Sequence, residues 1–360
     1  MSCTQFKNEL LSFLKKKSNT KPTAVLMPDF FQDRIINIDY DVAHFRSLIT
    51  EVANRKGGAI DGVAQTDLRG GNAVNTASAL AALGAQVSLI VCTSKLGYKQ
   101  LKFHFNRSRV DLSHVKISRR ASLTTALELA ADAGKANVML RDLGSLAEFS
   151  PSDLNESDYA LIESADYVCI FNWAGTKKYG TQLAEAVFGR VKANGKGKAY
   201  YDTADPTPNR DKIPELIRTV LKTAKLDILS LNENEAICYA SLLSDKIKKN
   251  EENLSFEALA IEAARVLAQQ LPARIDLHTT AFSASITKKK EVVVPSLKVR
   301  ALRATGAGDA WNAGNILGDA ASMTDECRLA LANYVAAYYL ASPEGTHPTK
   351  QALVKFIEKA

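Results

Sequence analysis

Residues 303–311 combine two glycines with a carboxylate in a pattern that suits phosphate chemistry. The stretch reads Arg-Ala-Thr-Gly-Ala-Gly-Asp-Ala-Trp, and a helical pattern begins at its aspartate. The small side chains of Gly306, Ala307 and Gly308 would let free backbone N–H groups at a helix N-terminus approach a ligand. The helix dipole favours an anion at this place, and phosphate is the usual one.

Asp309 follows these residues directly. A second negative group beside a phosphate would repel it, so the carboxylate is interpreted as a general base and not as an anion binder. It would take a proton from a substrate hydroxyl, which then attacks the terminal phosphoryl group of a donor. The alternative is a glycine-rich turn whose aspartate only caps the helix, and this stretch alone leaves both readings open.

A second pair of glycines opens another helix of small residues. Gly70 and Gly71 precede the segment 72–77, which contains Asn75. Such a start favours either a ligand close to the backbone or close packing of the helix on a sheet. The residues do not decide between the two.

Polar side chains also follow two apolar strands. Asn232 and Glu235 come after a strand predicted at 228–231, and Asp202 and Asp205 come after a neighbouring one. Open α/β sheets bind ligands at the carboxyl ends of their strands. Oxygen ligands three residues apart, as in Asn232 and Glu235, suit a hydrated Mg²⁺ that accompanies phosphates. The alternative is an asparagine that caps a helix with exposed glutamates.

Other catalytic motifs are absent from the sequence. It contains no P-loop, no dinucleotide-binding glycine motif after a strand, no protein-kinase H-R-D or D-F-G and no G-x-S-x-G. The five cysteines form no C-x-x-C pair, and the five histidines show no metal-ligand spacing. We therefore expect no disulfide and no catalytic transition metal.

The composition is that of a globular protein. The chain has 360 residues, of which 46% are hydrophobic and 24% charged, and its net charge is +7. Its lysine clusters lack the interleaved aromatic residues that stack on nucleic acid, so no nucleic-acid partner is expected. A positive field would suit anionic small substrates. Without a long apolar run or a signal-peptide core, we expect a cytoplasmic protein that does not associate with membranes.

Alternating strands and helices must position these candidate residues. From residue 23 on, short apolar runs alternate with Ala/Leu-rich segments, which predicts an α/β fold with a parallel sheet covered on both faces. Strands are predicted at 24–27, 86–92, 167–171, 198–201, 228–231 and 274–277. Helices are predicted at 72–83, 181–191, 214–223, 256–270, 308–318 and 325–340.

Two segments, 34–69 and 122–141, break this alternation. The second holds two apolar runs joined by a hairpin-like turn. We expect antiparallel strands that project from the parallel sheet as a small β-lid. Residues 1–21 are predicted as an amphipathic helical extension, and residues 22–360 as one domain that includes the lid.

Together these pieces resemble the ribokinase/PfkB family of carbohydrate and nucleoside kinases. The similarity covers about residues 24–355 and follows the family's order of motifs. Gly70-Gly71 with Asn75 resembles the N-terminal signature, and 306–309 resembles the C-terminal signature. The resemblance implies a ribokinase-like, doubly wound, mostly parallel sheet flanked by helices, with a small β-sheet lid.

The resemblance also implies roles for the matching residues. Asp309 would be the base, and the backbone of Gly306, Ala307 and Gly308 the anion hole. The implied substrate-binding residues are Asp33, Gly70, Gly71, Asn75 and Asn172. Those implied for the nucleotide are Asn232, Glu235, Asp202, Thr280, Ser283, Asn333 and Gly345, with Glu235 and Asn232 holding Mg²⁺ through water. A monovalent cation such as K⁺ and a homodimer through the lid are further expectations.

The sequence departs from the family pattern at three places. Pro28 stands where a glycine often ends the first strand, and Arg303 replaces a common aspartate. Arg303 could add positive charge for a phosphorylated acceptor, or it could be a surface residue. Residues 278–283 replace the usual Thr-x-Gly turn that helps to bind the nucleotide, which leaves ATP and ADP both open as donor.

The sequence therefore predicts a small-molecule kinase. It would transfer the terminal phosphoryl group of ATP or ADP to a hydroxyl of a sugar or sugar phosphate. One alternative is a nucleoside kinase, for which Tyr40 and Phe45 of the lid offer aromatic rings to stack on a base. The other is a non-catalytic sugar- or nucleotide-sensing protein, which would have lost the base or the anion hole. Neither the acceptor nor the oligomeric state follows from the sequence.

Overall fold

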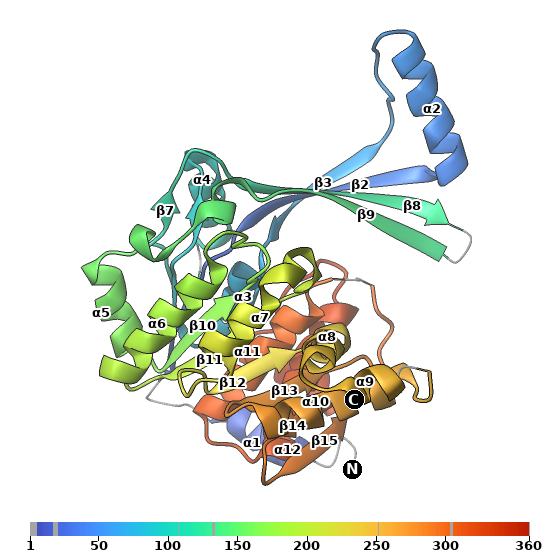
Figure 1. Ribbon diagram of the computed structural model, residues 1–360. Coiled ribbons are helices and arrows are strands. Elements are labelled where there is room, and N and C mark those ends of the chain that lie inside the picture. Colours follow the sequence, from blue (N-terminus) through green and yellow to red (C-terminus); the bar gives the residue numbers. More distant parts are fainter. Residues whose placement is uncertain are drawn as a thin grey trace.

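A nine-stranded sheet runs through the body of the molecule (Figure 1). This computed structural model describes residues 6–16, 21–106, 108–131, 134–250, 252–302 and 305–359. The strand order is β15-β14-β13-β12-β11-β10-β1-β4-β6, and only β14 and β15 run antiparallel to their neighbours. The strands are β1 (Thr23–Met27), β4 (Gln86–Leu89), β6 (Val110–Asp111), β10 (Tyr167–Phe171), β11 (Lys198–Asp202), β12 (Ile228–Leu231), β13 (Arg274–His278), β14 (Phe282–Ile286) and β15 (Glu291–Pro295).

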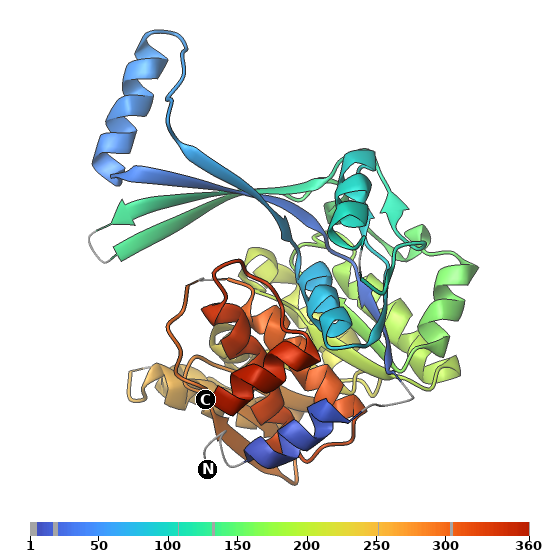
Figure 2. The same cartoon turned by 180° about the vertical axis from the view of Figure 1, so that it is seen from behind.

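Helices cover both faces of this sheet. One face carries α1 (Lys7–Lys15), α3 (Asn72–Ala82), α11 (Ala307–Ala320), α12 (Asp325–Ala341) and α13 (Lys350–Lys359), which Figure 2 presents in front. The other carries α5 (Glu156–Ser164), α6 (Gly180–Asn194), α7 (Ile213–Leu216), α8 (Glu233–Leu243), α9 (Asp245–Asn250) and α10 (Phe256–Gln270). Along β1, Val25 and Met27 belong to one core, and Ala24 and Leu26 belong to the other. The predicted doubly wound fold is confirmed.

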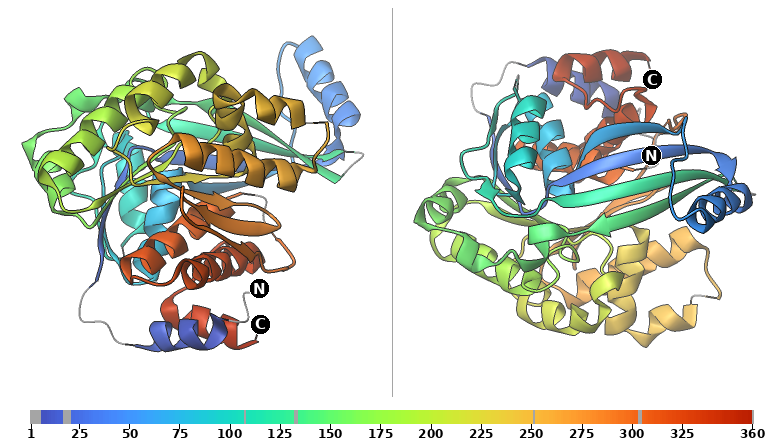
Figure 3. Two further views of the ribbon diagram at one scale, coloured as in Figure 1. Left: turned by 60° about the horizontal axis from the view of Figure 1, so that its bottom comes forward. Right: turned by 90° about the horizontal axis from the view of Figure 1, so that it is seen from above.

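A second sheet of four strands extends beyond the body (Figures 1 and 3). Its order is β3-β2-β8-β9, with β2 and β8 parallel and the two outer pairs antiparallel. Its strands are β2 (Phe31–Asp41), β3 (Ala64–Gly70), β8 (Ser122–Ala131) and β9 (Gly134–Asp142). The small sheet expected from 34–69 and 122–141 is therefore present, although its central pair is parallel and not antiparallel.

The segment 34–69 also contains a helix that the sequence analysis missed. Helix α2 (Val42–Asn54) projects from the far end of the small sheet (Figure 1). The side chain of Asp41 caps it by accepting a hydrogen bond of 2.7 Å from the backbone N–H of His44. None of its residues is buried, so no packed face marks it as part of the core.

Three other predicted elements differ from the structure. The helix expected at 214–223 divides into α7 and a π-helical turn, Ile217–Leu221. The strand expected at 86–92 ends at Leu89, and Cys92–Thr93 forms a separate strand, β5. This strand precedes α4 (Lys95–His104) in the chain and pairs with β7 (Lys116–Ile117), which follows that helix. Helix α1 covers only the middle of the predicted extension and buries Leu10 and Leu14. The flanking residues 1–5 and 17–20 lie outside the described chain, as does Arg303.

Two expected absences concern the described residues only. Cys92, Cys169, Cys238 and Cys327 are free thiols, and Cys3 is not among the residues described. None of the described helices combines the length and the apolar composition that crossing a bilayer would require.

Candidate active site

The first turn of α3 is held against the end of β1 by an aspartate. Asp29 accepts hydrogen bonds of 2.9 Å from the backbone N–H groups of Asn72 and Ala73, and one of 3.0 Å from the amide of Asn172. Gly71 adopts a φ of +97°, and a Cβ on it would lie 2.8 Å from the carbonyl oxygen of Asp29. The glycine thus lets the helix start close to the strand.

Asp309 lies on the first turn of α11 and faces this same helix start. Its two carboxylate oxygens accept hydrogen bonds of 3.1 Å each, one from the Asn72 amide and one from the Asn75 amide. Burial raises the pKa of Asp309 well above its ordinary value, and the nearby carboxylates of Asp202 and Asp29 raise it further. The two amides carry no charge and oppose this rise only in part, so the site increases the affinity of Asp309 for a proton.

The turn before Asp309 packs so closely that it leaves little room for side chains at its two glycines. Gly306 is the N-cap of α11 with a φ of +87°, and a Cβ on it would lie 2.5 Å from the hydroxyl of Tyr339. The backbone N–H of Ala310 donates the first helical hydrogen bond, to the carbonyl oxygen of Gly306. The N–H groups of the preceding residues in this turn therefore have no acceptor within the helix. A Cβ on Gly308 would approach His278 to 3.1 Å. The backbone of this turn can therefore bind an anion.

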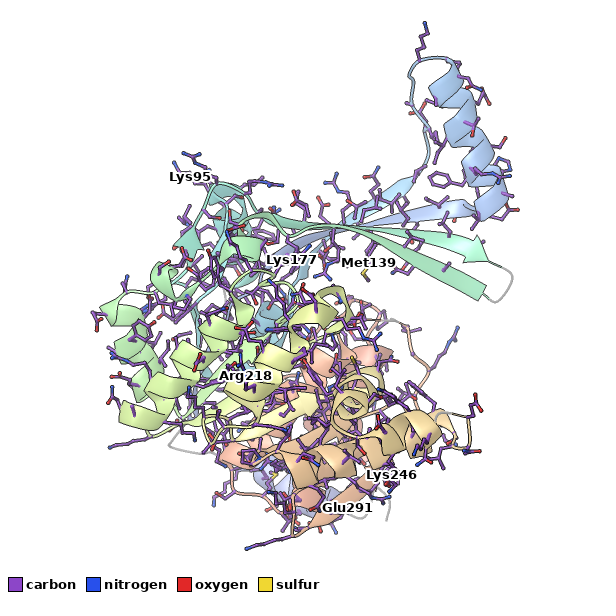
Figure 4. All side chains as sticks on the ribbon, in the orientation of Figure 1. Lys95, Met139, Lys177, Arg218, Lys246 and Glu291 are labelled. Carbon is purple, nitrogen blue, oxygen red and sulfur yellow. The ribbon has the colours of Figure 1, made fainter. Side chains whose placement is uncertain are left out.

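A cavity of about 670 Å³ opens beside Asp309. One of its walls is a single face of the small sheet, because alternate residues of each strand point to the same side. This wall consists of Phe31, Asp33, Ile35, Asn37, Thr66, Leu68, Thr124, Ala126, Glu128, Asn137, Met139 and Arg141. Figure 4 shows Met139 pointing from β9 toward the body of the molecule. The strand ends and the start of α11 form the opposite side.

Asp33 is one of two carboxylates in this wall, the other being Glu128. Register places it opposite Thr124 on β8, and Thr124 opposite Arg141 on β9. Burial raises the pKa of Asp33 to about 6, although the Thr124 hydroxyl and the charge of Arg141 lower it. Its Oδ1 atom is buried without a hydrogen-bond partner among the described residues. A ligand hydroxyl could supply that partner.

Glu235 and Asn232 form a reciprocal cap at the start of α8. Asn232 Oδ1 accepts from the Glu235 N–H at 3.0 Å, and both carboxylate oxygens of Glu235 accept from Asn232, at 2.9 and 2.8 Å. Burial raises the pKa of Glu235 well above its ordinary value, helped by Asp202. Among the described residues, no three acidic, histidine or cysteine side chains gather as metal ligands. A cation here would need water and phosphate oxygens to complete its shell.

The remaining residues expected at the nucleotide lie outside this cavity. Ser283 and Asn333 are buried and hydrogen-bonded to each other at 2.5 Å, and the indole N–H of Trp311 donates to both. Thr280 is exposed, and its backbone N–H donates to Glu233. Gly345, with a φ of +64°, directly follows two residues that line the cavity.

The structure thus brings the predicted residues into two groups. Those that line the cavity are Asp33, Gly71, Asn75, Asn172, Gly306 and Asp309. Gly70 lies against Asp33, and Asp202, Asn232 and Glu235 lie along the neighbouring strand ends. Sequence reasoning missed Asp29, although it follows a strand end just as Asp202 does, and it also missed Asn72.

Three solved structures illustrate the similarity of this fold to known proteins. A ribokinase of Arabidopsis thaliana complexed with ribose and ATP is 15% identical, with a TM-score of 0.68 and coverage of 94% of this chain and 99% of that chain. A ribokinase of Cryptococcus neoformans in complex with ADP is 16% identical, with a TM-score of 0.67 and coverage of 93% and 99%. An adenosine kinase of Sinorhizobium meliloti is 15% identical, with a TM-score of 0.69 and coverage of 95% and 99%.

The sequence comparisons are more specific than these likenesses of fold. No curated protein matches the chain in sequence. The family model described as pfkB family carbohydrate kinase matches residues 46–352. Because this match spans most of its length, the chain belongs to the pfkB family of carbohydrate kinases and is a phosphotransferase that acts on a hydroxyl group.

Proposed function

We propose that the protein transfers the terminal phosphoryl group of a nucleotide to a hydroxyl of a sugar or sugar derivative, with Asp309 as the general base. The observation that carries this proposal is the buried carboxylate of Asp309, held only by amides at a helix N-terminus and open to a cavity of about 670 Å³. A raised pKa suits a base that accepts a proton near neutral pH.

The proposed reaction is an in-line displacement at phosphorus. The acceptor hydroxyl gives its proton to a carboxylate oxygen of Asp309 while its oxygen forms a bond to the terminal phosphorus. The bond between that phosphorus and the bridging oxygen of the leaving nucleotide breaks in the same step. The N–H groups of Gly306, Ala307 and Gly308 hold the charge that develops on the phosphoryl oxygens. Asp33 orients the acceptor by receiving hydrogen bonds from its other hydroxyls.

The strand ends beyond the cavity suit the donor and its cation. Asp202 and Glu235 are buried carboxylates whose pKa values are raised and which lack a cation partner among the described residues. A hydrated Mg²⁺ would relieve their mutual repulsion, and bound there it would neutralise phosphate charge. We take ATP as the donor, with ADP as the alternative, and Asn232, Thr280 and Gly345 as residues near the nucleotide.

The small sheet is proposed as a lid over the acceptor. Its inner face lines the cavity, whereas its outer face exposes apolar side chains such as Leu123, Val138 and Leu140. Pairing of two copies through this outer face stays a prediction, and these side chains are its support.

The reason to prefer a sugar over a nucleoside is the position of the two aromatic residues expected to stack on a base. These residues, Tyr40 and Phe45, do not line the cavity. Tyr40 instead stacks on His44 of α2, with ring centroids 4.7 Å apart. A sensing protein would need neither a base nor an anion hole, and the presence of Asp309 and the glycines before it supports the kinase.

An acceptor-by-donor screen with Mg²⁺ tests the activity, and Asp309→Asn tests the base. The asparagine keeps the shape of the side chain but cannot accept the proton. We expect turnover to fall by at least about 10²-fold, while the dissociation constants of nucleotide and acceptor change only a few-fold. The matched control is Asp67→Asn, which removes an exposed carboxylate from the outer face of the small sheet. Near-normal turnover of Asp309→Asn would reduce Asp309 to a helix cap.

A further inference from the structure

Two arginines of the small sheet line the cavity without a carboxylate partner. Arg69 comes from β3 and Arg141 from β9. Within the described chain neither forms an ion pair, whereas Arg34, on the outer face of the same sheet, pairs with Asp67 at 2.6 Å. Among the described residues, both cavity-lining arginines are therefore without a carboxylate at ion-pair distance, although the charge of Arg141 acts on Asp33 and that of Asp309 acts on Arg69.

Arg141 lies beside the carboxylate proposed to bind the acceptor. It stands in the same cross-strand row as Thr124 and Asp33. Its guanidinium carbon is 5.0 Å from the ring centroid of Phe31, so an aromatic face supports the planar group. Because Arg141 also lines the cavity, its guanidinium is within the lining that an acceptor would contact.

Arg69 lies close to the proposed base. Its Nε donates to the side-chain oxygen of Asn75 at 3.5 Å, and the amide of Asn75 donates to Asp309. Its guanidinium carbon lies 5.6 Å from the ring centroid of Phe105. Burial lowers the pKa of Arg69, and the nearby charge of Asp309 opposes this shift only in part.

Among the described residues, Arg69 and Arg141 form no ion pair with Glu128 or Glu344, the other carboxylates of the lining. Glu128 lies four residues beyond Thr124 on β8, about 13 Å farther out along the strand. Glu344 comes from the loop after α12. An arginine without a partner matches a phosphate or carboxylate through two parallel hydrogen bonds, and a neutral sugar offers no such group.

We propose that the acceptor is an anionic sugar derivative, whose phosphate or carboxylate group is bound by Arg141 and Arg69 while its hydroxyls meet Asp33 and Asp309. This inference rests on the proposed function and narrows its acceptor class. The net charge of +7 would also draw such a substrate to the protein.

The test uses sets of three acceptors that share one sugar skeleton: the free sugar, its terminal phosphate ester and the corresponding sugar acid. Each is measured for kcat/KM with Mg·ATP or Mg·ADP, and by calorimetry without donor. We expect an anionic member to exceed the free sugar by at least about 10²-fold. Arg141→Gln and Arg69→Gln should each shrink this ratio by about 10- to 100-fold, as expected for a lost charged hydrogen bond. Preference for the ester or for the acid tells phosphate from carboxylate.

Two variants guard the interpretation. Arg34→Gln removes a guanidinium of the same sheet that does not line the cavity and should leave the ratio unchanged. Arg141→Lys keeps the charge without the planar fork and should restore part of the preference.

The two proposals fail in different ways. If the free sugar is the best acceptor, or if both Gln variants lower all three acceptors equally, the anionic acceptor is wrong and the kinase proposal stands. If no acceptor is phosphorylated but calorimetry still finds arginine-dependent binding of an anionic member, the anion site stands and the transfer proposal fails.

Discussion

Helix α11 carries a carboxylate near each end, Asp309 buried and Asp319 partly buried, and the pKa values of the two are shifted in opposite directions. Burial alone would raise both pKa values. At the N-terminal end, the partners of Asp309 are asparagine amides, and its pKa is raised. At the C-terminal end, Asp319 contacts Arg274 at 2.8 Å and Lys198 at 2.6 Å, and its pKa is lowered.

A polar stripe of α11 connects these two ends. Asn312 donates to Asp202 at 2.6 Å, and Asn315 donates to Asp276 at 2.9 Å. Asp202 ends its strand near Asp309, whereas Asp276 is paired with Arg274 and Arg328. The comparison teaches that burial does not make a carboxylate reactive. What separates the two ends is direct contact: a lysine and an arginine contact Asp319, whereas asparagine amides contact Asp309.

The largest effect should come from breaking the paired end. Arg328 is 1% exposed and contacts Asp276 at 3.0 Å. Arg328→Met should lower the free energy of unfolding by about 3–5 kcal/mol, because it leaves a buried charge short of its partner. Urea denaturation measures this loss. Arg265→Met, which removes an exposed pair with Glu291, is the control and should cost no more than about 1 kcal/mol. Equal losses would contradict the distinction.

A smaller loss is expected from Asp319→Asn, at about 1.5–3 kcal/mol. The pKa of Asp319 is lowered, so its stabilisation is present above the ordinary aspartate pKa and is lost as the pH falls. The deficit of the variant should therefore shrink in acid. Denaturation at neutral and acid pH measures it, and a deficit independent of pH would show that shape, not charge, matters.

The same substitution at the N-terminal end of α11 should raise the free energy of unfolding and not lower it. Asp309→Asn should stabilise the fold by about 0.5–2 kcal/mol at neutral pH, because the asparagine removes a charge that burial and two carboxylates disfavour. Since the pKa of Asp309 is raised, this gain should be full above the folded-state pKa and vanish below the ordinary aspartate pKa. A thermal melt at two pH values measures it. A destabilised variant would mean that the carboxylate is structural.

The smallest effect concerns the coupling between Asp202 and Asp309. The charge of Asp202 is, after burial, the largest contribution that raises the pKa of Asp309. Asp202→Asn should therefore lower that pKa and move the acid limb of the pH–rate profile to lower pH, whatever it does to the rate itself. The profile of Asp67→Asn should not move. If the acid limb of the Asp202→Asn profile does not move, the charge of Asp202 does not affect the pKa of Asp309.

Much of the fold follows from sequence periodicity because the main sheet is buried on both faces. The strands 167–171 and 228–231 and the helix 256–270 have the predicted bounds, since apolar runs leave little choice there. Helix α2 was missed because it packs no face against the core. An exposed helix within a segment of strands lacks the signal that the prediction uses.

The candidate site was predictable only where one local motif carries it. The motifs around Asn75 and Asp309 meet, as the resemblance implies. The row of Asp33, Thr124 and Arg141 was out of reach, because strand register joins residues that are far apart in the sequence. The sequence leaves two interpretations of Asn232 and Glu235 open, a hydrated Mg²⁺ site and a helix cap. The hydrogen bonds of the helix cap are present in the structure.

The difference between the two faces of the small sheet restricts the insertions and deletions that its strands can tolerate. Adding or deleting one codon within β8 or β9 would turn every later side chain of that strand to the other face. Apolar side chains of the outer face would then replace the polar side chains that line the cavity. Adding or deleting two codons would keep the same side chains on the cavity face and would change only the length of the strand. The register shift between Ile38 and Asp41 obeys this restriction, because it lies beyond Asn37, the outermost β2 residue of the wall. Length variation in natural variants of this sheet should therefore come in even steps.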